Sequence, residues 1–235
     1  MPNHTPQPLA GVTALVTTGP TREPIDPVRY ISNRSSGKTG LAIARSLVEA
    51  GARTIVVCGP TIEPAPAGVE LLPVETAAEM RAACAAALPV DVAVCVAAVA
   101  DWRVRQASGE KLTKSAGVTT LELVANPDIL HELSRPGPRR PQLVVGFAGE
   151  TGLVLERAVA KRRRKGCDWI VANDLAAPGV FGGEHNRVAL ITAAGVESWP
   201  LMAKTAIADR LVDRIAGHVT DPHLVRHRRT ECSAR

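Results

Sequence analysis

Aromatic residues are scarce in this chain: they make up 3% of its 235 residues, whereas 46% of the sequence is hydrophobic and 22% is charged. An aliphatic core is therefore expected, and the composition is not that of a disordered chain. The five cysteines are odd in number and widely spaced, and no CxxC pair occurs among them. They indicate reduced, mostly buried thiols and argue against a disulfide framework or a cysteine-based metal site.

Long apolar runs are also missing. Residues 1–10 contain no apolar core of a signal peptide, and no stretch approaches the length needed to cross a bilayer. We therefore expect a cytoplasmic protein with no membrane partner. The net charge of +5 comes largely from KRRRK at residues 161–165 and HRR at residues 227–229. Because no nucleic-acid-binding motif accompanies these runs, they favour an anionic small substrate over a nucleic-acid partner.

What the sequence does contain is a regular alternation of β-branched runs and Ala-rich helical patterns. Because the runs are apolar on both faces, they predict a Rossmann-like α/β fold, an open and mainly parallel sheet with helices on both faces. A turn at Ala194 and Gly195 predicts a C-terminal β-hairpin added at the sheet edge. Strands are expected at residues 12–18, 54–59, 90–98, 142–148 and 169–174, and helices at 40–52, 76–88, 126–133, 153–165 and 204–219. The expected organisation is a flexible leader (1–10), a single α/β domain (11–219) and a flexible basic tail (220–235).

Two polar segments interrupt the alternation, at residues 18–36 and 101–118. Loops of this length inside a compact domain are usually lids or binding loops. Both follow the carboxyl ends of expected strands, which is where open α/β sheets bind ligands. We therefore expect the binding site beside these two segments.

Two common nucleotide-binding motifs are absent from the first of these segments. SSGKTG at residues 35–40 resembles the end of a P-loop, but Ser32 stands where that motif requires its first glycine. The dinucleotide fingerprint also fails, because TTGPTREP has one glycine, and Pro20 and Pro24 prevent a helix from starting there. A nicotinamide-dependent enzyme is therefore the weaker interpretation.

The small residues Ser35, Ser36 and Gly37 can still open a helix. The free N–H groups and the dipole of a helix start favour an anion. An ordinary N-cap by Ser35 or Ser36 is an equally good interpretation from these residues alone.

A family resemblance rests on six motifs taken together. They are GPTREPIDPVRYISNRSSGKTG (19–40), AAVADWR (97–103), EKLTK (110–114), NPDIL (126–130), GFAGET (146–151) and IVAND (170–174). In their order and spacing they resemble bacterial phosphopantothenoylcysteine synthetase, from about residue 12 to residue 219. In most bacteria that enzyme is the C-terminal domain of the bifunctional coenzyme A biosynthesis flavoprotein, behind a flavin-dependent decarboxylase.

The resemblance implies that residues 11–219 form a ligase domain. The implied activity is a CTP-dependent phosphopantothenate–cysteine ligase with Mg²⁺. The carboxylate of 4′-phosphopantothenate would attack CTP to give an acyl-cytidylate, and the amine of L-cysteine would then displace CMP. The family also implies a homodimer, with the two flaps near each other's sites, and a separate decarboxylase is a candidate partner.

The resemblance places catalytic roles in the two long segments. Asn33 matches the family residue needed for the second step, where an amide can donate to the acyl oxygen without adding charge. Arg29 is expected to bind an anionic group. Lys111 and Lys114 match a flap that closes over the intermediate, although Thr113 replaces a lysine of the family's KxKK pattern. The expected catalytic set is Asn33, Lys111 and Arg29, and the expected substrate-binding set is Arg29, Asn33, Ser35, Ser36, Gly37 and Lys114.

The family's nucleotide-binding pattern falls on later motifs. Lys161 and Lys165 are four residues apart on one expected helix, so they face the same side and can hold phosphates together. Phe147 can line the base pocket, although a core position is the ordinary alternative. Asp101 can bind the nucleotide directly or through Mg²⁺, which typically takes one or two carboxylates with phosphate oxygens. The expected nucleotide-binding set is Cys95, Val96, Ala97, Asp101, Lys111, Pro127, Asp128, Ile129, Leu130, Phe147, Lys161 and Lys165.

Two alternatives stay open. The altered flap at Thr113 is also compatible with a paralogous nucleotide-dependent carboxylate–amine ligase of specialised metabolism. A nucleotide-binding Rossmann-like module without ligase activity is the other alternative, but a simple binder needs neither Asn33 nor Lys111.

Overall fold

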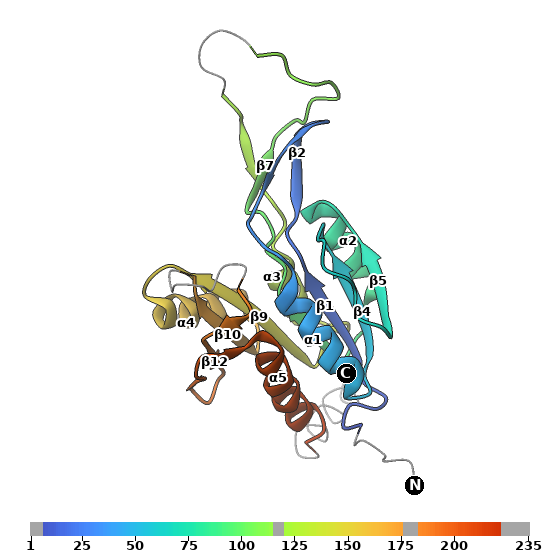
Figure 1. Ribbon diagram of the computed structural model, residues 1–235, viewed down its shortest axis with the longest axis vertical. Coiled ribbons are helices and arrows are strands. Elements are labelled where there is room, and N and C mark those ends of the chain that lie inside the picture. The colour runs from blue at the N-terminus through green and yellow to red at the C-terminus, as the bar shows by residue number, and fades with distance from the viewer. Residues whose placement is uncertain (1–6, 115–119, 176–182, 222–235) are drawn as a thin grey trace.

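The structure is a computed structural model that describes residues 7–114, 120–175 and 183–221. Most of the predicted leader (1–10) and tail (220–235) therefore lies outside the described residues. The chain forms a broad α/β body from which a narrow arm projects (Figure 1).

An eight-stranded sheet with strand order β13-β12-β10-β9-β6-β1-β4-β5 forms the centre of the body. Its neighbouring strands are parallel from β10 to β5, whereas β12 and β13 pair antiparallel at one edge. The predicted, mainly parallel sheet and its C-terminal hairpin are thus confirmed. The strands are β1 (Thr13–Thr18), β4 (Arg53–Cys58), β5 (Val69–Pro73), β6 (Val92–Cys95), β9 (Leu143–Glu150), β10 (Trp169–Asp174), β12 (Val188–Ile191) and β13 (Val196–Ser198).

Helices cover both faces of the sheet, as predicted (Figure 1). The helices α1 (Lys38–Glu49) and α5 (Lys204–Val219) pack against each other and share one core cluster on one face. The other face carries α2 (Ala77–Ala87), α3 (Ile129–Ser134) and α4 (Val154–Lys165).

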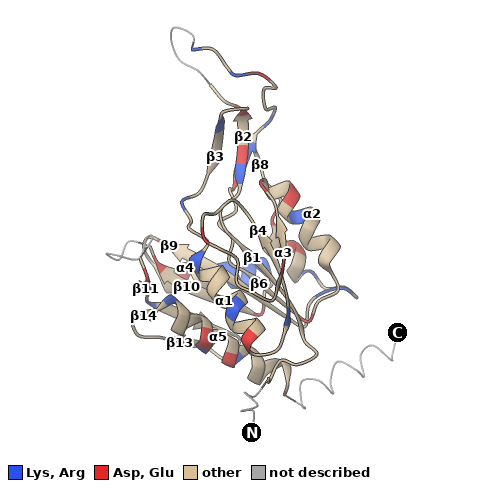
Figure 2. Cartoon of the chain, turned by 45° about the vertical axis from the view of Figure 1, so that its right-hand side comes forward, with Lys and Arg blue, Asp and Glu red and all other residues tan. Residues whose placement is uncertain are grey.

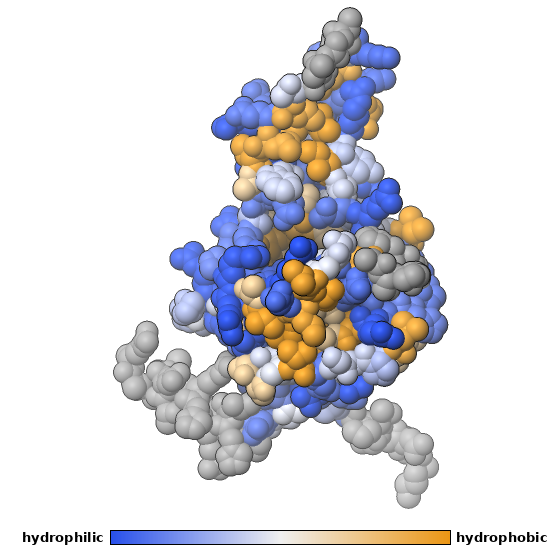
Figure 3. Space-filling model, turned by 90° about the vertical axis from the view of Figure 1, so that its left-hand side faces the viewer, coloured by the Kyte–Doolittle hydropathy of each residue, from blue (hydrophilic) through white to orange (hydrophobic). Residues whose placement is uncertain are grey.

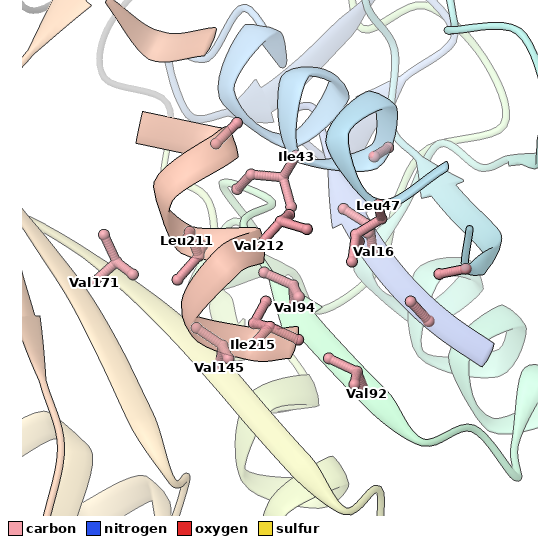
Figure 4. Packing of buried hydrophobic residues seen from close by; sticks show 14 of the residues in the cluster. Val16, Ile43, Leu47, Val92, Val94, Val145, Val171, Leu211, Val212 and Ile215 are labelled. Atoms are coloured by element: carbon pink, nitrogen blue, oxygen red, sulfur yellow. The ribbon is translucent and has the colours of Figure 1, made fainter. Parts of the chain in front are cut away.

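The core is mainly aliphatic, as the shortage of aromatic residues predicts, although Trp169 and Trp199 are also buried in it. Successive strand residues point to opposite faces, so Leu15 packs under α2 while its neighbour Val16 packs under α1. Figure 4 shows Ile43 and Leu47 of α1 and Leu211, Val212 and Ile215 of α5 over the valines of the central strands. This packing fixes the start of α1 and the start of α5 at the carboxyl edge of the sheet.

The arm consists of two antiparallel hairpins. They are formed by β2 (Arg22–Asp26) with β3 (Arg29–Ser32) and by β7 (Trp102–Val104) with β8 (Leu123–Ala125). We name residues 21–32 and the described part of residues 101–125 the arm. Both hairpins lie in or beside the two segments predicted as irregular loops, so the pairing in those loops was missed. The edge strand β5 and the short pair β11 (His185–Asn186) with β14 (Met202–Ala203) were missed as well.

Gly40 allows the first turn of α1 to approach β1 closely. A Cβ atom at Gly40 would lie 2.3 Å from Oγ1 and 2.5 Å from Cβ of the buried Thr18. We expect Gly40→Ala to lower the free energy of unfolding by about 1–3 kcal/mol, because a side chain would be forced into a packed contact.

The matched control is Gly217→Ala in α5, where an added Cβ meets no atom within 4 Å. Alanine should stabilise that exposed helical position by about 0.5–1 kcal/mol. Urea denaturation measures both variants. Equal effects would show that the contact with Thr18 does not limit the size of residue 40.

Candidate functional site

A cavity of about 650 Å³ lies at the carboxyl ends of β1 and β6. From β1 the chain builds one half of the sheet through β4 and β5, and then crosses back to build the other half through β6, β9 and β10. Open α/β sheets bind ligands where the strand order reverses in this way. The structure therefore has its cavity where the two long segments predict the binding site.

The start of α1 forms one wall of this cavity. Gly37 has a left-handed conformation (φ 78°) and precedes the helix without a side-chain cap. The hydroxyl oxygens of Ser35 and Ser36 accept long hydrogen bonds from the N–H groups of Gly37 (3.3 Å) and Lys38 (3.5 Å). Within the described residues, the backbone N–H groups of Thr39 and Gly40, the next two of the first turn, have no hydrogen-bond acceptor. Neither serine is the N-cap, and the helix start is open to an anion.

Asn33 lies in the segment that joins the arm to α1 and lines the cavity. Its Nδ2 donates a hydrogen bond of 2.9 Å to the carbonyl oxygen of Val99, in the segment that follows β6. That segment is also tied to the residues after β1, because the N–H of Ala98 donates to the carbonyl oxygen of Gly19 at 2.9 Å. These bonds leave Oδ1 and one N–H of Asn33 available to a ligand.

The end of β6 supplies Cys95, Val96 and Ala97 to the lining, as predicted. Burial raises the pKa of the Cys95 thiol well above its usual value. A protonated thiol is a poor nucleophile, so Cys95 contributes shape and backbone groups to the cavity rather than covalent chemistry.

The opposite wall contains two lysines of α4. Lys161 and Lys165 both line the cavity, so their predicted common orientation is confirmed. The Nζ of Lys161 donates a 2.8 Å hydrogen bond to the carbonyl oxygen of Phe147, and Lys165 forms an ion pair with Asp128. Burial lowers the pKa of Lys161. Burial is also the largest influence on Asp128 and raises its pKa, but the hydrogen bonds from Lys165 and from the N–H of His131, with the charges of both residues, together bring that pKa below its usual value. Phe147 and the predicted residues Pro127, Asp128, Ile129 and Leu130 line the same wall.

Asp101 and Asp128 are the two carboxylates of the lining. In the part of the chain that the structure describes, no three His, Cys, Asp or Glu residues are grouped as a metal site. Mg²⁺ at a nucleotide takes only one or two carboxylates together with phosphate oxygens. Asp101 is exposed and Asp128 is paired with Lys165, so Asp101 is the donor that best fits such an ion.

Three predicted residues lie outside the cavity lining. Lys111 and Lys114 are exposed on the arm. Nη1 of Arg29 donates to Asp26 Oδ2 (2.6 Å) and to the carbonyl oxygen of Leu112 (3.2 Å), and Asp26 Oδ2 also accepts from the N–H of Leu112 (3.2 Å). Asp26 and Arg29 thus hold both backbone groups of the residue that follows Lys111. The roles of Arg29, Lys111 and Lys114 stay predictions.

We expect Asp26→Asn to loosen the flap at Leu112. The side chain of Asp26 is fully buried and accepts three backbone N–H groups. Burial opposes its ionisation, but these N–H groups and Arg29 hold the pKa of Asp26 below its usual value. An amide would direct a donor at a donor, so trypsin should cleave after Lys111 about tenfold faster.

Glu110→Gln is the matched control for this cleavage, because among residues 7–114, 120–175 and 183–221 only the backbone of Glu110 is hydrogen-bonded. Mass spectrometry of the fragments identifies the cleaved bond. Cleavage after Lys111 at the same rate in both variants would contradict a role for Asp26 in holding the flap.

Several lining residues were missed from the sequence. Asn173 and Asn186 add two amides to the cavity, and Lys38 and Lys204 add two cations. A signal for Lys204 was present, because it stands on the apolar stripe of an expected amphipathic helix. Its partners in that stripe are Ile207, Ala208 and Leu211.

The lining is positively charged overall. It contains five basic side chains (Arg34, Lys38, Lys161, Lys165 and Lys204) and two carboxylates. Figure 2 marks the basic residues in blue, including those of α1 and α4. Such a surplus in a concave site attracts an anionic ligand. Among the described helices, none is long and apolar enough to span a membrane.

Comparison with known proteins identifies the family of this chain. The family of the DNA/pantothenate metabolism flavoprotein C-terminal domain matches residues 9–219. The chain belongs to this family. The predicted resemblance to phosphopantothenoylcysteine synthetase is thereby confirmed.

The curated relatives of this chain include coenzyme A biosynthesis bifunctional proteins CoaBC. That of Mycolicibacterium smegmatis is 43% identical over 225 residues, covering 90% of this chain and 54% of the relative. That of Escherichia coli K12 is 42% identical over 212 residues, covering 88% of this chain and 52% of the relative. The chain therefore spans about half the length of these relatives.

A solved structure shows the same fold. The crystal structure of the C-terminal domain of a CoaBC protein superposes with a TM-score of 0.76 at 37% identity. The match covers 92% of this chain and 99% of that domain. The chain therefore shares the fold of the C-terminal domain of a CoaBC protein.

Proposed function

We propose that the chain is a CTP-dependent phosphopantothenate–cysteine ligase that forms 4′-phosphopantothenoyl-L-cysteine in coenzyme A biosynthesis. One observation carries the proposal: a single cavity in a member of this family gathers Asn33, the open start of α1 and the lysine pair of α4. The relatives are named for coenzyme A biosynthesis. The choice of CTP rests on the resemblance to the bacterial type.

In the first step, a carboxylate oxygen of phosphopantothenate attacks the α-phosphorus of CTP. The bond from that phosphorus to the bridging oxygen breaks, pyrophosphate leaves, and an acyl-cytidylate forms. Two anions must approach each other, so the step needs fixed positive charge. Lys161 and Lys165, and Lys111 once the flap closes, provide it. Asp101 would hold Mg²⁺, which would neutralise further negative charge on the phosphates when bound.

In the second step, the amine of cysteine attacks the acyl carbon, the bond to the cytidylate oxygen breaks, and CMP leaves as the nitrogen loses a proton. Negative charge develops on the acyl oxygen in the transition state. The free N–H of Asn33 can donate to that oxygen while the Val99 carbonyl fixes the amide. An uncharged donor adds no charge that would compete for the nucleophile.

The test is product formation by the pure protein from phosphopantothenate, cysteine, CTP and Mg²⁺. Mass spectrometry should detect the amide, and omission of cysteine should remove it. Absence of the amide with CTP and with every other nucleoside triphosphate would refute the proposal. An amide formed only from a different acid would favour the paralogous ligase, as would failure to restore growth to a strain lacking the synthetase.

We also propose that two copies of the chain associate through the arm. Figure 3 shows apolar side chains gathered on the arm, and Val28, Tyr30, Trp102, Leu121 and Leu123 each expose 40% or more of their surface there. Lys111 lies outside the cavity of its own chain. In a dimer, the arm of one copy would carry its Lys111 to the cavity of the other copy. Light scattering that finds an active monomer would contradict this. The other proposed partner is a flavin-dependent decarboxylase of coenzyme A biosynthesis, either fused to this domain or separate from it.

A further inference from the structure

Lys204 is an almost fully buried lysine at the first position of α5. It exposes 8% of its surface, and its side chain lines the cavity. Within the described residues its ammonium group has no hydrogen bond and no ion pair, and residues 176–182 contain no Asp or Glu. Glu184, the carboxylate that attracts it, is paired with Lys38 instead. Burying an ammonium without a counter-ion is costly, so the stability of the fold does not explain this lysine.

The surroundings of Lys204 are set up for an anion. Burial lowers the pKa of Lys204, and repulsion by Lys38 opposes the attraction of Glu184. Lys38 begins α1, which packs against α5. The unpartnered N–H groups of the first turn of α1 line the same cavity. Lys38 is already paired with Glu184 and lies 3.8 Å from a carboxylate oxygen of Glu63. The positive charge left for an anion is therefore that of Lys204 and the helix start.

We infer that Lys204, with Lys38 and the start of α1, binds the pyrophosphate part of the nucleoside triphosphate and then the released pyrophosphate. This rests on the proposed ligase function. Lys161 and Lys165 of α4 lie on the opposite wall of the cavity. They would contact the rest of the triphosphate, while Lys204 and Lys38 contact its pyrophosphate part. Pyrophosphate fits this end better than a phosphate monoester does, because its two phosphoryl groups can contact Lys204 and the helix start together.

The experiment measures the binding of inorganic pyrophosphate to the full chain by calorimetry, with no other substrate present. Lys204→Met should weaken this binding at least tenfold, and Lys204→Arg should retain most of it. The charge-matched control is Arg214→Met, which removes an exposed cation of α5 that does not line the cavity. It should bind pyrophosphate as the wild type does.

The melting temperature separates binding from structure. Because a buried unpaired charge is removed, Lys204→Met should melt at the wild-type temperature or above it. Wild-type affinity in Lys204→Met would overturn the inference, as would a lower melting temperature. It would also be overturned if the variant lost affinity for phosphopantothenate, a phosphate monoester, but not for pyrophosphate. A chain that binds pyrophosphate through Lys204 but makes no amide would refute only the ligase function.

Discussion

Asn33→Ala is expected to reduce amide formation about 10²-fold to 10³-fold while pyrophosphate release in the first turnover continues. The loss of one donor to a developing oxyanion has an effect of this size. The side chain of Asn33 lines the cavity, and one of its N–H groups is held by Val99, so the other has a fixed direction. Because the first step does not use this donor, the acyl-cytidylate should accumulate.

Rapid quenching followed by chromatography measures the pyrophosphate and the amide in the same samples. The matched control is Asn126→Ala, because Nδ2 of Asn126 also donates a 2.9 Å hydrogen bond to a neighbouring carbonyl oxygen, that of Ala100. Asn126→Ala should still form one amide for each pyrophosphate released. If Asn33→Ala formed amide at the wild-type rate, its proposed role would be wrong.

Lys111→Ala should slow the first step by about 10²-fold, the second large effect that we predict. A mobile ammonium that reaches the triphosphate stabilises charge as the phosphoryl group transfers. Lys111 is adjacent to Leu112, whose two backbone groups are held by Asp26 and Arg29, so its position in the flap is defined. Arginine at residue 111 should restore part of the rate, since it keeps the charge but changes the geometry.

Single-turnover release of pyrophosphate measures this step. Lys114→Ala is the control in the same loop, because Lys114 carries the same charge but stands two residues beyond the anchored Leu112, whereas Lys111 is adjacent to it. We expect it to slow the step less than threefold. Equal losses in the two variants would mean that the loop contributes general positive charge and that Lys111 has no specific place.

The body could be predicted from the sequence because each element there has one strong signal. Runs such as residues 90–98 and 142–148 are apolar on both faces, and only strands covered by helices on both sides accommodate them. The arm gave no such signal. Its strands are short, β2 contains Pro24, and much of their surface is exposed. The strands pair within each hairpin, but the two hairpins also contact each other, as in the hydrogen bond between Asp26 and Leu112, which are 86 residues apart. Periodicity does not reveal such contacts.

The site shows the same limit. The spacing of Lys161 and Lys165 was sufficient to place both on one face, because helix geometry is local. The choice between an N-cap and an anion-binding start at Ser35 and Ser36 depended on the backbone of Gly37, and no pattern in the sequence decides it. Lys204 reaches the cavity only because α5 packs beside α1 at the far end of the chain.

The proposed ligase reaction is tested most directly by the amounts of nucleotide products formed for each amide, with CTP and ATP compared side by side. In the presence of phosphopantothenate, cysteine and Mg²⁺, we predict one CMP and one pyrophosphate for each amide formed, with CTP as the preferred nucleotide. Formation of CDP and inorganic phosphate would contradict the acyl-cytidylate route. Amide formation that consumes no nucleotide would contradict the account as a whole.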